Sequence, residues 1–205
     1  MKIETFTLGM LQTNCYLVEN EETKELVIID PAVCTNTLIQ HIKQSGYQPK
    51  AILLTHGHFD HVMGINALVD AFGISVYLHE KEQQLLGSPE LNLSYTRESY
   101  SYKQGIGLKD GTLLEVAGFR IQIIHTPGHT AGGCCYYLAE DEVLISGDTL
   151  FCQSVGRTDF PTSSTRELVT SIREKLFCLP DTVMVYPGHG CATCIGDEKQ
   201  YNPYV

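Results

Sequence analysis

The chain has 205 residues, a hydrophobic content of 43% and a formal net charge of −10. This length suits one large domain or two small ones. The acidic balance, with no local cluster of lysine or arginine, argues against nucleic acid as a partner. The sequence has no signal-peptide pattern and no run of about 18 apolar residues, so we expect a cytoplasmic protein with no membrane partner and with its cysteines reduced.

The first half of the chain predicts a strand-rich start followed by alternating helices and strands. Lys2–Leu8, Asn14–Glu19 and Leu26–Ile29 have the length and residue types of short strands. A helix is expected at about Thr37–Ser45, and the apolar run Ala51–Leu54 predicts a strand that is buried on both faces. Two more elements are expected next: a helix at Gly64–Phe72 and a strand at Ile74–Leu78.

The second half begins with a polar, tyrosine-rich stretch, Leu86–Lys109, in which no element is predicted. A hairpin is expected over Leu113–Thr126, turning at Ala117-Gly118. The remaining predicted elements are a pair of strands, a helix with Ser163 or Ser164 as its N-cap, and a final strand: Cys134–Leu138 with Val143–Ser146, Ser164–Phe177, and Thr182–Tyr186.

The segment Thr55–His61 contains four potential metal ligands in seven residues: His56, His58, Asp60 and His61. Three imidazoles so close together repel one another once they are protonated, so a fold has little reason to gather them without a cation. His56 and His58 flank a glycine and can bind one cation. Asp60 and His61 are adjacent and can face a second cation a few ångströms away.

Three further loops each carry one ligand-type residue directly after a predicted strand: His129, Asp148 and His189. Loops beyond the ends of strands are where sites are usually built, so we expect these residues to meet the segment Thr55–His61 at one edge of the sheets. Together they make five histidines and two aspartates. This set serves two ions with four contacts each if one carboxylate bridges them, at the separation of about 3.5–4 Å usual for two-metal hydrolytic sites.

The motifs that carry these residues resemble, in order and spacing, those of the metallo-β-lactamase superfamily: Asp30, Thr55–His61, Pro127–Thr130, Gly147–Thr149 and Pro187–Gly190. Two further segments are most similar to the small glyoxalase II-like hydrolases of that superfamily: Gly147–Phe151 and Ser154–Asp159. The resemblance implies an α/β fold, a four-layer αβ/βα sandwich in which two mixed β-sheets pack face to face with helices outside. It also implies that residues 1–205 form a single domain.

The same resemblance implies a role for each candidate ligand. The first metal would be held by three histidines: His56, His58 and His129. The second metal would be held by one carboxylate and two histidines: Asp60, His61 and His189. Asp148 would bridge the two metals, and Asp30 would orient the metal-binding loop from outside it.

Departures from related branches narrow the expected chemistry. True β-lactamases resemble this pattern but carry a cysteine where Asp148 stands and lack a ligand at His61. Full-length glyoxalase II has an additional C-terminal helical domain that supplies much of its glutathione site, whereas this chain ends about 16 residues after His189. The resemblance therefore favours thioester chemistry without implying glutathione as the thiol.

The predicted function is that of a metal-dependent hydrolase in which a metal-bound hydroxide attacks the carbonyl of a small anionic thioester or related ester. Two Zn²⁺ are the expected cofactors, and Fe and Mn suit the same ligands. Asp60 could also hydrogen-bond the nucleophile. The alternative is a persulfide dioxygenase, a class that resembles this chain closely and uses one iron at the three-histidine side.

Three other features have competing interpretations. Arg157 can bind an anionic group of the substrate, or it can form an ion pair with Asp159. The tyrosines of the unassigned stretch can form a wall of the pocket or simply pack: Tyr95, Tyr100 and Tyr102. Cys191 and Cys194 form a C-x-x-C pattern, which without a second pair is weak support for a redox or metal site.

Overall fold

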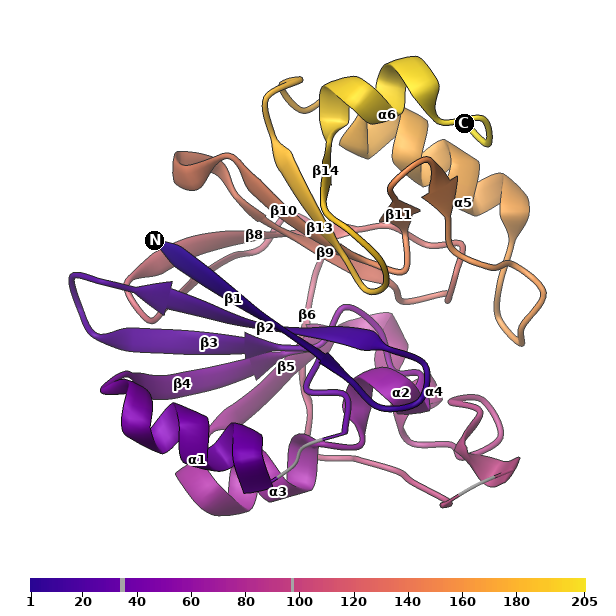
Figure 1. Cartoon of the computed structure of the whole chain (residues 1–205). Helices are drawn as coiled ribbons and strands as arrows, with labels where there is room; N and C mark the ends of the chain where they lie inside the picture. The colour runs from indigo at the N-terminus through magenta and orange to yellow at the C-terminus, as the bar shows by residue number, and fades with distance from the viewer. Residues whose placement is uncertain (34–35, 97) are drawn as a thin grey trace.

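The computed structural model describes residues 1–33, 36–96 and 98–205. It contains two six-stranded sheets that pack face to face, with helices on their outer sides (Figure 1). The predicted four-layer αβ/βα sandwich is therefore confirmed.

The first sheet comes from the N-terminal half and holds its strands in chain order: β1 (Lys2–Leu8), β2 (Thr13–Asn20), β3 (Glu25–Ile29), β4 (Gln48–Leu53), β5 (Ser75–His79) and β6 (Ile106–Leu108). The first three strands form an antiparallel meander, and β3 to β6 run parallel. Parallel neighbours need crossover connections, which here include the helices α1 (Asn36–Ser45) and α3 (Ile65–Phe72).

The second sheet comes from the C-terminal half, in the order β14-β13-β10-β9-β8-β7. Its strands are β7 (Leu113–Val116), β8 (Phe119–His125), β9 (Cys134–Leu138), β10 (Val143–Gly147), β13 (Met184–Pro187) and β14 (Thr193–Cys194). Only the β10–β13 pair is parallel among the described pairs of this sheet. A small ribbon of β11 (Leu150–Phe151) and β12 (Ser154–Val155) follows β10.

Two helices cover the outer face of the second sheet (Figure 1). The first is α5 (Thr165–Ser171), which continues as the π-helical turn η4 (Ile172–Leu176), and the second is α6 (Ile195–Tyr201). Shorter elements lie in the connections: α2 (Phe59–Val62), η1 (Glu80–Glu82), α4 (Gln83–Leu86), η2 (Ser94–Thr96) and η3 (Ala139–Asp141).

The core follows from the alternation of side chains along the strands. On β2, Tyr16 and Val18 belong to the cluster between the two sheets, whereas Cys15 and Leu17 belong to the cluster under α1 and α3. A third cluster lies under α5, η4 and α6. Full burial of each such aliphatic side chain contributes about 1.5–3 kcal/mol to stability. The three clusters together hold the two sheets and their helices in place.

The predicted elements are confirmed within a few residues at their ends. Ser164 is the N-cap of α5, and its side chain accepts a hydrogen bond from the Glu167 amide at 3.3 Å. The unassigned stretch Leu86–Lys109 contains η2 and β6, and β6 pairs with β5 although it has only three residues. The helix α6 was not predicted, because its seven residues include Gly196 and few apolar side chains.

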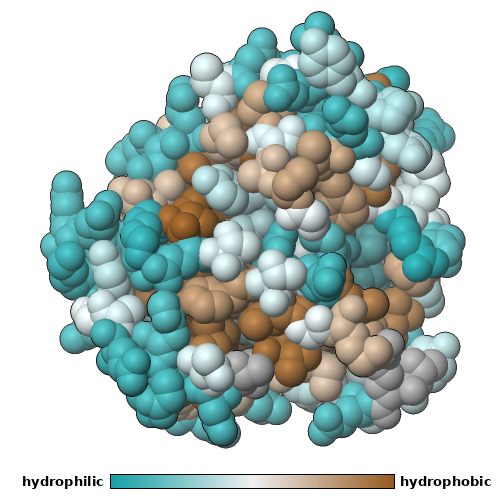
Figure 2. All heavy atoms as spheres, in the orientation of Figure 1, coloured by the Kyte–Doolittle hydropathy of each residue, from teal (hydrophilic) through white to brown (hydrophobic). Residues whose placement is uncertain are grey.

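Among the described helices, none is both long enough and apolar enough to cross a membrane. Some large hydrophobic side chains are nevertheless exposed, and Met10 and Leu11 in the β1–β2 turn are examples. Figure 2 shows hydrophobic residues gathered in the middle of one face, with hydrophilic residues around them.

Candidate metal centre

The segment Thr55–His61 leaves the first sheet directly after β4 and turns into the short helix α2. His58 precedes α2 with extended backbone angles, φ −63° and ψ 147°. Asp60 and His61 lie within α2 itself, so the helical turn directs them differently from His56 and His58. This change from strand to helix separates the four ligand-type residues into two pairs.

The other three candidates arrive from the second sheet. His129 follows β8 in the turn Pro127-Gly128, Asp148 follows β10 immediately, and His189 follows β13. The β-bridge between Thr13 and His189 joins the two halves beside the site. All seven predicted ligands thus come together at one edge of the sandwich, as expected from their positions after strands.

Six of the candidates form two triads in which the potential ligand atoms lie within 4.8 Å of one another: His56, His58 and His129, and Asp60, His61 and His189. Asp148 lies between the triads. Its Oδ1 is 3.4 Å from His61 Nε2, and its Oδ2 is 3.4 Å from His129 Nε2. One carboxylate therefore faces a member of each triad, which is the placement that a bridging ligand requires. That these residues bind metal stays a prediction.

Several buried polar atoms at the site have no hydrogen-bond partner among the described residues: Nε2 of His56, His58 and His61, and Oδ1 of Asp148. Buried polar groups are normally satisfied, so four such atoms at one place require an explanation. Imidazole nitrogens and a carboxylate oxygen are donors that suit Zn²⁺, Fe and Mn. The donor set therefore fits one or two divalent cations.

The pKa values in the centre reflect burial and neighbouring charges. Burial, reinforced by the other imidazoles, lowers the pKa of His56 and of His58 well below the ordinary value. Both side chains are therefore neutral at pH 7, the state in which imidazole binds a metal. Burial alone would also lower the pKa of His61, but the surrounding carboxylates, Asp60 foremost, outweigh it and raise that pKa. The second triad thus favours positive charge at its centre.

Outer hydrogen bonds fix the orientation of the histidine rings. His129 Nδ1 lies 2.8 Å from the carbonyl oxygen of Arg157, and His189 Nδ1 lies 3.0 Å from that of Leu11. Each contact occupies Nδ1 and leaves Nε2 directed toward Asp148. Such partners fix the tautomer and the ring angle of metal-binding histidines.

Asp30 contacts the loop that it was predicted to orient, and its carboxylate also forms, with His56 and His61, a third group whose potential ligand atoms lie within 4.8 Å of one another. Its Oδ1 accepts a hydrogen bond from the Thr55 amide at 2.8 Å, and its Oδ2 accepts one from the Thr55 hydroxyl at 2.5 Å. Oδ2 also lies 2.9 Å from His61 Nδ1. Both carboxylate oxygens are thus engaged by protein groups, an arrangement that orients the loop.

Glu82 is a residue that the sequence reasoning missed. Its side chain is buried, and it accepts hydrogen bonds from the Gly57 amide and the Thr130 hydroxyl, each at 3.0 Å. Burial raises the pKa of Glu82 to about 7, although these donors oppose the shift. Gly57 and Thr130 adjoin candidate ligands from different sheets, so one carboxylate holds together the two loops of the first triad. Glu82 is about 25 residues from Gly57 in the chain, and no local pattern marks it.

Glycine is required where the chains approach most closely. A methyl group on Gly188 would lie 2.2 Å from Asp148 Oδ1 and 2.8 Å from His61 Cε1. Gly147 has φ +50°, and a methyl group there would lie 2.3 Å from Thr55 Oγ1. The glycines that accompany Asp148 and His189 therefore allow the loops of the two sheets to meet.

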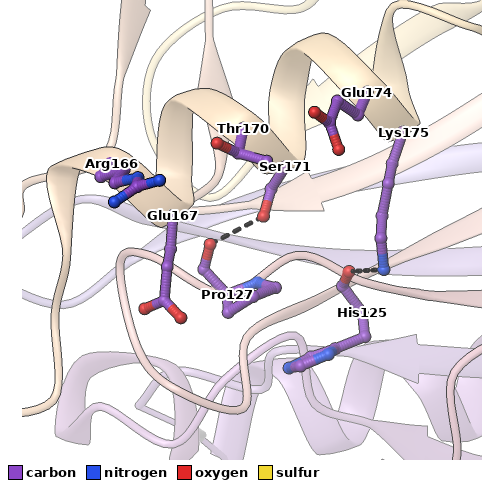
Figure 3. Close-up of a pocket in the computed structure, with 8 residues that line it drawn as sticks. All are labelled: His125, Pro127, Arg166, Glu167, Thr170, Ser171, Glu174 and Lys175. Carbon is purple, nitrogen blue, oxygen red and sulfur yellow. Dashed lines mark hydrogen bonds between the residues drawn. The ribbon is translucent and has the colours of Figure 1, made fainter.

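The turn that carries His129 is supported from behind by the α5–η4 helix (Figure 3). Ser171 Oγ donates a hydrogen bond to the Pro127 carbonyl at 2.8 Å, and Lys175 Nζ donates one to the His125 carbonyl at 2.7 Å. A cavity of about 340 Å³, lined mostly by residues of polar or charged type, lies between this helix and the turn.

A second cavity, of about 270 Å³, opens onto the candidate metal centre. Its apolar walls come from several loops: Leu11, Phe59, Leu93, Phe151 and Phe160. Arg157 also lines it, but its guanidinium forms two hydrogen bonds to Asp159, at 2.9 and 2.6 Å, and stacks 4.2 Å from the Phe160 ring centroid. Of the two alternatives for Arg157, the structure therefore shows the ion pair with Asp159. The Arg157 side chain lies at the rim of the cavity.

The tyrosines and the C-x-x-C pattern lie elsewhere. Tyr100 and Tyr102 pack against the cluster under α1 and α3, Tyr95 is exposed, and none of the three lines the cavity at the centre. Cys191 and Cys194 are free thiols outside both triads.

A family model, related sequences and solved structures all relate this chain to metallo-β-lactamase superfamily proteins. A family model described as the Metallo-beta-lactamase superfamily matches residues 8–189. The chain is similar to the hydroxyacylglutathione hydrolase GloC of Haemophilus influenzae, with 35% identity over 216 residues that cover 100% of this chain and 98% of that protein.

Solved structures are similar over the same extent. The BLEG-1 B3 metallo-beta-lactamase superimposes with a TM-score of 0.94 and 40% identity, covering 99% of each chain. TTHA1623, in a di-iron-bound form, superimposes with a TM-score of 0.85 and 37% identity, covering 98% of this chain and 100% of that one.

Proposed function

The chain belongs to the metallo-β-lactamase superfamily, and from that premise we propose that it is a dinuclear metallohydrolase that cleaves a thioester or related ester of a small anionic molecule. The observation that carries the proposal is the position of Asp148, which faces His61 of one triad and His129 of the other. A carboxylate shared between two triads suits a pair of cations better than a single one.

The residues named above would hold the cations, three in each triad with Asp148 between them. When bound, divalent cations would ionise a water near neutral pH and polarise a carbonyl oxygen. We propose Zn²⁺ as the first choice because three imidazole ligands suit it. Iron is the second choice, and the di-iron form of TTHA1623 supports it.

The chain's own residues would position the substrate and the nucleophile. The apolar walls of the cavity, Phe151 and Phe160 among them, would exclude bulk water from the carbonyl. Asp60, held by the Thr13 hydroxyl at 2.9 Å, could accept a hydrogen bond from the attacking water. Arg157 would contact an anionic substrate group at the rim, in exchange for its pairing with Asp159.

A thioester is the preferred substrate because a thiolate leaves without help from a general acid, and the described part of the cavity lining offers no lysine or tyrosine for that task. The name of the similar protein GloC supports this choice. Opening of a β-lactam ring is the second candidate, which the similarity to BLEG-1 supports. The persulfide dioxygenase alternative needs only the first triad and leaves the assembly of the second triad unexplained.

The test combines metal analysis with a substrate panel. The purified chain is loaded with Zn²⁺ or Fe²⁺, and its metal content is measured by mass spectrometry. Hydrolysis is then assayed on S-lactoylglutathione, a short acyl thioester, a lactone and a chromogenic β-lactam. We expect two metals per chain and fastest turnover of a thioester.

The His58→Ala variant should lose metal from the first triad and lower kcat/KM by at least about 100-fold. His41→Ala is the matched control, because His41 lies on α1, is paired with Glu4 at 2.7 Å and is outside both triads. Activity that survives in His58→Ala would contradict the first triad. One iron per chain, with oxygen consumption on glutathione persulfide, would overturn the hydrolase.

A further inference from the structure

The C-x-x-C pattern suggests that Cys191 pairs with Cys194, but the structure places these thiols in different surroundings. The Cys194 sulfur caps α6 and accepts a hydrogen bond from the Asp197 amide at 3.4 Å. Cys191 lies in the turn before β14, where its side chain neighbours that of Cys152 and raises the pKa of the Cys152 thiol. Cys152 is distant in sequence and lies in the turn between β11 and β12.

A buried carboxylate holds the two turns together. Glu198 of α6 accepts a hydrogen bond from the amide of Gln153, the neighbour of Cys152, at 3.0 Å. It also accepts one from the hydroxyl of Thr193 at 2.6 Å, two residues beyond Cys191. Because Glu198 is only 1% exposed, the framework that sets the two cysteines side by side belongs to the protein interior.

Both cysteines of this pair are exposed to solvent. All seven cysteines among the described residues are free thiols, and Cys34 lies outside those residues. Two neighbouring thiols that are open to solvent can both be reached by a small oxidant.

We propose that Cys152 and Cys191 form a reversible disulfide when the protein meets a peroxide. One thiol attacks a peroxide oxygen, which gives a sulfenic acid and releases the other oxygen as water or an alcohol. The second thiol then displaces the hydroxyl group as water, and the S–S bond forms. The two thiols lose two hydrogens in total, and the peroxide is reduced by two electrons.

A disulfide between Cys152 and Cys191 would lie beside the candidate metal centre. Phe151 precedes Cys152, and its ring centroid lies 6.1 Å from that of His189. His189 is two residues before Cys191, and both Phe151 and His189 line the cavity. A Cys152–Cys191 bond would therefore fasten one wall of the cavity to the loop that carries a candidate ligand.

The experiment treats the metal-loaded, full-length protein with hydrogen peroxide, blocks remaining thiols by alkylation, and maps cross-linked peptides by mass spectrometry. We expect one dominant link, between Cys152 and Cys191, that dithiothreitol removes. Cys178 is the internal control, because it is exposed and its thiol donates to the Glu174 carbonyl at 3.0 Å rather than facing another cysteine. A dominant link between Cys191 and Cys194 would overturn the proposal. So would alkylation of Cys152 and Cys191 at the level of Cys178.

Two variants separate the pairings. Cys194→Ser should keep the link, whereas Cys191→Ser should abolish it and leave Cys152 as a sulfenic acid that a dione probe captures. Loss of the link in Cys194→Ser, with retained secondary structure by circular dichroism, would contradict the assignment. The mapped link does not depend on catalysis, so this result stands apart from the outcome of the substrate panel.

Discussion

Asp30 illustrates how one side chain can set the geometry of several others. Its backbone adopts φ +48°, in the left-handed region that aspartate tolerates better than most residues, and its amide donates to the Leu53 carbonyl at 3.1 Å. This turn brings the carboxylate beneath Thr55 and His61. The strained backbone and the three side-chain contacts serve the same end, which is the direction of the His61 ring.

We therefore expect Asp30→Asn to weaken metal affinity by about 10–100-fold, because an amide cannot accept from all of the donors that face Asp30. Affinity is measured by competition with a chromogenic chelator. Asp70→Asn, on the exposed side of α3, should change nothing. Equal affinities for the two variants would show that Asp30 has no part in orienting the centre.

Glu82 predicts a pH dependence of stability in the metal-free protein. Burial raises its pKa to about 7 from the ordinary 4.5, so between these values the folded state holds a proton that the unfolded state has released. Stability should therefore fall as the pH rises from about 4.5 to 7, by up to about 3 kcal/mol. Glu82→Gln should remove this component, measured by urea unfolding at several pH values between 4.5 and 8. Identical pH slopes for the two proteins would contradict the assignment.

At the scale of the element, the loop Pro187–Gly190 shows how backbone space limits the site. Gly188→Ala places a methyl group 2.2 Å from Asp148 Oδ1, so we expect loss of bound metal and of activity. Gly190→Ala is the matched control in the same loop. Its methyl group meets no atom of the described residues within 4 Å, although its φ of +78° costs about 1–2 kcal/mol of stability. Metal content of the two variants decides the matter, and retention of metal by Gly188→Ala would refute the predicted crowding.

The elements also show which features a sequence can reveal. The strands around Leu17 and Ile52 and the helix α5 were predictable because burial and capping leave a periodic local pattern. The candidate ligands were predictable because histidine and aspartate are conspicuous directly after strands. Glu82, the strand β6 and the proximity of Cys191 to Cys152 were not, since each depends on partners distant in the chain. Arg157 is a similar case, because the sequence allowed either a substrate contact or an ion pair, and the structure shows the ion pair with Asp159.

At the scale of the whole molecule, the first sheet supplies four candidate ligands and the second supplies three. Bound metal should therefore stabilise the assembly of the two halves. At a metal concentration about 100 times Kd the gain is about 2.7 kcal/mol, which corresponds to a rise in Tm of roughly 5–10 °C for a chain of this size. Treatment with a chelator should lower Tm by that amount, measured by calorimetry, and Zn²⁺ should restore it whereas Mg²⁺ should not. An unchanged Tm would mean that no cation links the halves.

Each triad takes two members from the first sheet and one from the second. Neither of these two triads is therefore complete until the two halves of the chain have docked. A folding intermediate with both sheets formed but wrongly apposed would lack one member of each triad. Stoichiometric metal uptake thus reports that the two halves have docked in the correct register, and it can be followed in refolding experiments without any knowledge of the substrate.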